Sequence, residues 1–140
     1  MIYLDTSALV KLLLPEPESA SLRGWLSARA SAPRISSALA EVEVSRAVRV
    51  AATEGRVRAG RLSAALASAE AIIAGLQLIA VDKRVLRAAA SLPSPRLRSL
   101  DAVHVATASL YAGALQALVS YDVRMLAAGA GEGLPTASPG

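Results

Sequence analysis

Met1-Ile2-Tyr3-Leu4-Asp5-Thr6-Ser7 is the stretch from which the rest of the chain can be interpreted. Its first four residues are apolar, which is typical of a strand buried on both faces of a parallel sheet. The apolar stretch from Ala8 to Leu14 predicts a helix, which Thr6 or Ser7 can cap. Asp5 then lies where a strand's carboxyl end meets a helix N-terminus, and open α/β sheets bind ligands at that edge.

The composition limits the fold and the chemistry. The 140 residues suit one domain, and a chain with 54% hydrophobic but only 3% aromatic residues must have an aliphatic core. Without cysteine there is no disulfide or zinc–thiolate site, and the single histidine, His104, nearly excludes zinc clusters. The apolar run from Ala71 to Val81 is too short to span a membrane, and we find no signal peptide. We therefore expect a cytoplasmic protein.

The net charge of +4 comes mainly from arginine, which accounts for 13 of the 15 basic residues. Arginine suits bidentate contacts to phosphate. If several acids gather in one pocket, the remaining surface is more basic than the total indicates, which favours a polyanionic ligand. The alternative is that the arginine content only reflects genome composition.

Apolar segments alternate with helical periodicity along the rest of the chain. The sequence predicts a single α/β domain over residues 1–140 with a parallel sheet, and a flexible Gly- and Pro-rich tail from about residue 129. We expect Gly55 to stop one helix, and Asp82 and Ser99 to cap two others. Further strands are expected at 34–37, 78–81, 117–120 and, at an edge, 134–137, and helices at 19–30, 38–54, 57–76, 83–90, 100–112 and 123–128.

Acidic residues recur at one kind of position. Asp5 and Asp122 follow strands, Asp101 is in the first turn of a helix, and Glu41 and Glu43 belong to the helix after the second strand. Each acid alone is explained as a helix cap or first-turn residue. Together they can converge at one sheet edge, where clustered carboxylates repel one another unless a cation joins them. Mg²⁺ and Mn²⁺ prefer such oxygen ligands and activate water against phosphodiesters.

Four segments of the chain resemble the motifs of the PIN-domain ribonucleases, and most of all those of the VapC toxins of bacterial toxin–antitoxin pairs. The segments, which span nearly the whole chain, are Leu4–Leu9, Ala40–Ala47, Leu100–Ala108 and Val119–Asp122. The resemblance implies a three-layer α/β/α sandwich with a central parallel sheet. It also implies Mg²⁺- or Mn²⁺-dependent endoribonuclease activity on structured RNA such as tRNA or rRNA, a cognate VapB-type antitoxin, and often a homodimer.

The resemblance also assigns individual residues. Asp5, Asp101 and Asp122 match the first, third and fourth acids of the family, as metal-binding catalytic residues. The second acid is Glu43 or, with the register shifted by two, Glu41, and residues two apart on a helix point to nearly opposite sides, so both cannot enter one pocket. We favour Glu43, because its spacing from Ser37 and from Arg46 and Ala47 fits the family pattern.

The supporting residues follow from the same motifs. Ser120 and Thr6 match residues that help to hold the metal site. His104 is three residues after Asp101 and shares its helix face, and we interpret it as a supporting residue rather than a proton shuttle. The candidates for contacts to RNA are Arg46, Arg49, Arg98 and Arg124.

Two alternatives remain beside the nuclease hypothesis. One is a PIN-like RNA-binding or scaffold protein without turnover. The other is a phosphatase with an aspartyl nucleophile, which we disfavour because such enzymes have a second Asp two residues after the first, where this chain has Ser7.

Overall fold

The structure is a computed structural model that describes residues 1–140, with five strands, seven α-helices and one 3₁₀ turn. No helix is both long enough and apolar enough to cross a lipid bilayer. In chain order the elements are β1 (Ile2–Leu4), α1 (Thr6–Leu13), α2 (Ser19–Ser27), β2 (Arg34–Ser37), α3 (Leu39–Thr53), α4 (Leu62–Ala74), β3 (Gln77–Ile79), α5 (Lys83–Ala90), α6 (Ser99–Ser109), the 3₁₀ turn (Ala112–Ala114), β4 (Ala117–Val119), α7 (Val123–Gly131) and β5 (Thr136–Ala137).

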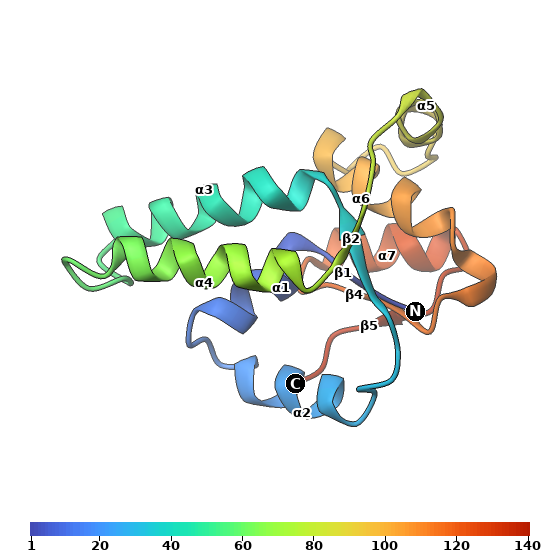
Figure 1. The fold of residues 1–140 in the computed structure, drawn as a ribbon. Coiled ribbons are helices and arrows are strands. Elements are labelled where there is room, and N and C mark those ends of the chain that lie inside the picture. Colours follow the sequence, from blue (N-terminus) through green and yellow to red (C-terminus); the bar gives the residue numbers. More distant parts are fainter.

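The strands form one parallel sheet in the order β3-β2-β1-β4-β5, with β1 at its centre. Helices cover both faces of this sheet (Figure 1), and the predicted α/β/α sandwich is therefore confirmed. Side chains alternate along β1 because successive residues of a strand point to opposite faces. Ile2 and Leu4 pack with α1 to α4, whereas Tyr3 packs with α6 and α7.

The strand order reverses beside β1, at the centre of the sheet. The chain leaves β1 through α1 on one face of the sheet, and it leaves the neighbouring β4 through α7 on the other face. Diverging connections of this kind open a gap at the carboxyl ends of the two strands, which is where α/β proteins bind ligands. Asp5 follows β1 and Asp122 follows β4, so both acids lie at the carboxyl ends of these two neighbouring strands.

Helices α3 and α4 pack against each other as a long hairpin that projects from the sheet (Figure 1). Gly55 stops α3 as predicted, with a left-handed φ of 75° that glycine adopts without strain. The prediction of a helix from Val57 to Leu76 was wrong at its start, because Gly60 also has a φ of 75° and α4 begins only at Leu62.

The C-terminal residues pack against the sheet, which corrects the prediction of a flexible tail. Helix α7 continues to Gly131, and β5 pairs with β4 at the predicted edge position. A Cβ atom at Gly129 would lie 2.7 Å from Leu118 and 3.2 Å from Thr136. Glycine at this position therefore lets α7 pack closely on β4 and β5.

Candidate functional site

Asp5 is buried at the start of α1, with 2% of its surface exposed. It caps the helix itself, because its Oδ1 accepts a hydrogen bond of 2.8 Å from the amide of Ala8. The expected cap by Thr6 or Ser7 was therefore wrong. Burial raises the pKa of Asp5, and hydrogen bonds from Ala8, Ser120 and Ser7 offset only part of this effect.

Two serine hydroxyls connect Asp5 to the loop after β4. Ser120 Oγ donates to Asp5 Oδ2 over 2.7 Å and accepts from the amide of Asp122 over 3.0 Å. Ser7 Oγ donates to Asp5 Oδ1 over 2.7 Å and accepts from the amide of Tyr121 over 2.8 Å. The loops after β1 and β4 are thus fixed relative to each other by hydrogen bonds that meet at Asp5. Sequence reasoning had named Ser120 but had missed Ser7.

Asp122 caps α7 and forms an ion pair with Arg124. Arg124 Nη2 lies 2.6 Å from Asp122 Oδ2, and its Nε donates to Oδ1 over 3.2 Å. These contacts lower the pKa of Asp122 to about 2. Arg124, one of the predicted RNA contacts, is therefore already bound to a carboxylate.

Asp101 lies in the first turn of α6, and its Oδ2 is buried without any hydrogen-bond partner. The predicted cap by Ser99 was wrong, since α6 starts at Ser99 and has no side-chain cap. Burial raises the pKa of Asp101, and the negative charge of Asp122 raises it further. The negative charges of Asp101 and Asp122 therefore repel each other.

Glu43 is directed toward the first motif, whereas Glu41 is exposed on α3. Glu43 Oε2 accepts a hydrogen bond of 2.6 Å from Thr6 and lies 2.7 Å from His104 Nε2. Burial alone would raise the pKa of Glu43, but these hydrogen bonds outweigh it and the pKa is lowered. Glu43, Thr6 and His104 come from α3, α1 and α6, so this contact joins both layers of helices.

The arginines predicted to contact RNA have different environments. Arg46 and Arg49 are exposed on α3, and Arg98 is exposed just before α6. None of these three side chains forms an ion pair. They are available to a ligand, whereas Arg124 must first leave Asp122.

The acids suit a hard divalent cation in their chemistry. All four offer carboxylate oxygens, Asp101 Oδ2 has no partner, and Asp122 already binds the positive charge of Arg124. No three Asp, Glu, His or Cys side chains are arranged as a ready ligand set. The carboxylate oxygens of the four acids are suitable ligands for such a cation. In this structure, hydrogen bonds hold Asp5 and Glu43, and the ion pair with Arg124 holds Asp122.

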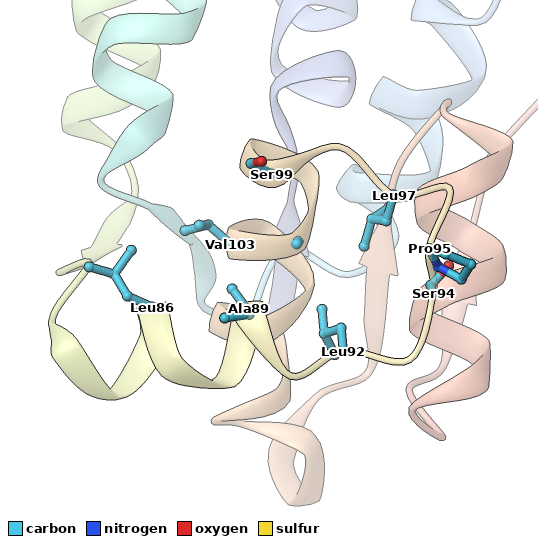
Figure 2. Close-up of a pocket in the computed structure, with 10 residues that line it drawn as sticks. Leu86, Ala89, Leu92, Ser94, Pro95, Leu97, Ser99 and Val103 are labelled. Carbon is cyan, nitrogen blue, oxygen red and sulfur yellow. The ribbon is translucent and has the colours of Figure 1, made fainter.

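A hollow of about 370 Å³ lies beside this site, between α5, the loop 91–98 and α6 (Figure 2). Leu86, Leu92, Leu97 and Val103 make it mainly apolar, and none of the four acids lines it. It therefore does not extend the carboxylate site.

Comparison with known proteins identifies the class of this fold and site. The PIN domain family model matches residues 2–130, and the chain belongs to the PIN-domain family. Within it, the chain is 42% identical to Ribonuclease VapC35 of Mycobacterium tuberculosis over 142 residues, covering 100% of this chain and 98% of that protein. It is 44% identical to Ribonuclease VapC46 of the same organism over 138 residues, covering 99% and 97%. These matches confirm the predicted resemblance.

A solved structure has the same overall fold. The crystal structure of PAE2754 from Pyrobaculum aerophilum aligns with a TM-score of 0.61 at 23% sequence identity, covering 96% of this chain and 82% of that one. Similarity at this level of identity concerns the arrangement of the sheet and helices.

Proposed function

We propose that this protein is a VapC-type endoribonuclease toxin that hydrolyses phosphodiester bonds in structured RNA. The full-length similarity to proteins named as ribonucleases supports the activity. The proposed unit is a single PIN domain over residues 1–140. Its catalytic and metal-binding residues are Asp5, Glu43, Asp101 and Asp122, with Thr6, Ser120 and His104 in support.

One observation carries this proposal above all others: Asp101 has a buried oxygen without a partner, and the negative charge of Asp122 also acts on this carboxylate. An isolated protein gains nothing from this arrangement, because an unpaired buried carboxylate oxygen and like-charge repulsion both cost stability. A divalent cation removes both costs. The site is therefore best explained as one adapted to bind a cation, and Mg²⁺ or Mn²⁺ suits oxygen donors.

The residues around the acids have separate tasks in this mechanism. A divalent cation supplies positive charge, which activates water and stabilises the charge that develops on the phosphate. Ser7 and Ser120 hold the Asp5 carboxylate in one orientation, and Thr6 does so for Glu43. Arg124 neutralises Asp122 before the cation is bound. Arg46, Arg49 and Arg98 bind the phosphates of the RNA.

The same family resemblance suggests the partners. A VapB-type antitoxin blocks the nuclease, the toxin acts in the cytoplasm, and two copies form a homodimer. Co-expression tests the antitoxin: growth arrest caused by this chain should be relieved by a VapB-type protein encoded beside it, and sedimentation of the purified chain gives its oligomeric state.

Cleavage of structured RNA tests the activity directly. The wild-type protein should cut RNA when Mg²⁺ or Mn²⁺ is present, and EDTA, Asp5→Asn or Asp101→Asn should each abolish cutting. Cleavage that survives EDTA and both substitutions would refute the assignment. Binding of RNA without any cleavage would favour a scaffold protein without turnover.

A further inference from the structure

Tyr3 and His104 form a buried connection between the sheet and Glu43. Both side chains are almost fully buried, with 0% and 1% of their surfaces exposed. The amide of Ser37 donates to the Tyr3 hydroxyl over 3.1 Å, that hydroxyl lies 2.7 Å from His104 Nδ1, and His104 Nε2 lies 2.7 Å from Glu43 Oε2. The connection therefore begins at the end of β2 and ends at a proposed metal-binding acid.

The two ends of the connection set the direction of its links. The amide of Ser37 can only donate, so the Tyr3 oxygen accepts that hydrogen bond and the hydroxyl proton stays available to His104. The Glu43 carboxylate can only accept, so His104 Nε2 carries a proton and donates to it. A neutral imidazole with its proton at Nε2 accepts at Nδ1. The Tyr3 hydroxyl accordingly donates to His104 Nδ1.

The donors leave one oxygen of Glu43 free. Oε2 accepts from both His104 and Thr6, whereas Oε1 has no hydrogen bond within the protein and is not sealed from solvent. Two donors on one oxygen restrict rotation of the carboxylate. Residues that orient a metal ligand in this way commonly change metal affinity about 10- to 100-fold when they are replaced.

We propose that Tyr3 and His104 are positioning residues, in which the Tyr3 hydroxyl fixes His104 as the Nε2–H tautomer so that His104 and Thr6 direct Glu43 Oε1 toward the cation. The part that concerns Glu43 rests on the proposed nuclease function. The part that concerns the tautomer is a property of the free protein, and it can be measured without metal or RNA.

Nitrogen NMR of the imidazole tests the tautomer, and the single histidine removes any problem of assignment. A long-range ¹H–¹⁵N correlation spectrum of the metal-free wild type should show a protonated Nε2 and an unprotonated Nδ1. Tyr3→Phe should weaken this preference and shift the Nδ1 resonance, because only the contact with Glu43 then remains. Tyr111→Phe is the matched control, because Tyr111 packs against the same core cluster without a hydrogen bond to His104, and it should leave the spectrum unchanged. A proton on Nδ1 in the wild type, or an unchanged Tyr3→Phe spectrum, would overturn the proposal.

A pair of substitutions at His104 tests its effect on Glu43. Gln can place an N–H donor near the position of Nε2, whereas Leu fills similar space without a donor. In calorimetric titrations with Mg²⁺, His104→Leu should weaken binding about 10-fold or more, and His104→Gln should retain most of the affinity. A role in packing alone predicts equal affinities for both variants, which would contradict the proposal. A wild type with the expected tautomer but no RNA cleavage would refute the nuclease function instead.

Discussion

Asp101 is the residue at which the conflict between stability and function is clearest. Its buried Oδ2 has no partner, and the charge of Asp122 adds to the cost of ionising it. Asp101→Asn should therefore stabilise the protein in EDTA by about 1 kcal/mol, which corresponds to roughly 2–4 °C in Tm. Differential scanning calorimetry measures this change. Asp82 gives the contrast, because it caps α5 with two hydrogen bonds, and Asp82→Ala should lower stability by about 1 kcal/mol. A lower Tm for Asp101→Asn than for the wild type would show that the Asp101 carboxylate is stabilised by its surroundings in the folded protein.

Glu43 and Glu41 form a natural pair for comparison, since both lie in α3 and only Glu43 contacts Thr6 and His104. Glu43→Gln should reduce the rate of RNA cleavage at least about 100-fold at a fixed Mg²⁺ concentration, because it removes a proposed metal-binding carboxylate. Glu41→Gln should cleave at the wild-type rate. The reverse pattern would mean that the second acid of the motif is Glu41.

Part of the site can be read from the sequence, and part cannot. The four candidate acids could be picked out because each lies in a segment that resembles a motif of the PIN-domain family. The hydrogen bonds to Asp5 from Ser7 and Ser120 link residues more than 100 positions apart in one case, and no local pattern reports them. Tyr3 looked like an ordinary core residue, since only the register of β1 beside β2 brings its hydroxyl to Ser37.

Helices and strands were predicted best where a single feature of the sequence, such as an apolar run, indicated the element. Short apolar runs indicated β1 and β4 because buried parallel strands contain little else. Helix starts were harder to predict, because several polar residues compete for each cap. Asp5 caps α1, which was expected of Thr6 or Ser7. Helix α6 begins at Ser99, one residue earlier than predicted, and Ser99 does not cap it.

Helix α7 offers a test at the level of a single element. A Cβ at Gly129 would lie 2.7 Å from a side-chain carbon of Leu118, whereas nothing lies within 4 Å of a Cβ at Gly131. Gly129→Ala should therefore lower the free energy of unfolding by about 1–3 kcal/mol through overpacking. Gly131→Ala should be neutral or stabilise the helix by up to about 1 kcal/mol. Urea denaturation of both variants compares these values, and equal stabilities would mean that α7 does not pack closely on the sheet.

The whole molecule has a net charge of +4, although its proposed site gathers four acids. Binding of RNA to such a surface depends on the release of counterions, so affinity should fall as salt rises. Replacing both Arg46 and Arg49 with Gln should weaken binding and reduce the slope of log K against log salt by about 1 for each phosphate that is no longer neutralised. Fluorescence anisotropy at several salt concentrations gives this slope. Arg23→Gln, on α2, is the control, and an equal decrease there would indicate a diffuse electrostatic surface.

The fold brings the ends of β1, β2 and β4 and the start of α6 to one edge of the sheet. The central claim is that acids from these distant segments share a divalent cation there. A ligand that binds only the folded state raises its stability in proportion to the logarithm of ligand concentration.

Calorimetric Tm as a function of Mg²⁺ or Mn²⁺ concentration, for the wild type and Asp101→Asn, tests this claim most directly. The wild type should start with the lower Tm in EDTA and gain stability steadily as the cation is added, while Asp101→Asn should gain little. Parallel curves, or a wild type whose Tm does not respond to either cation, would contradict the account.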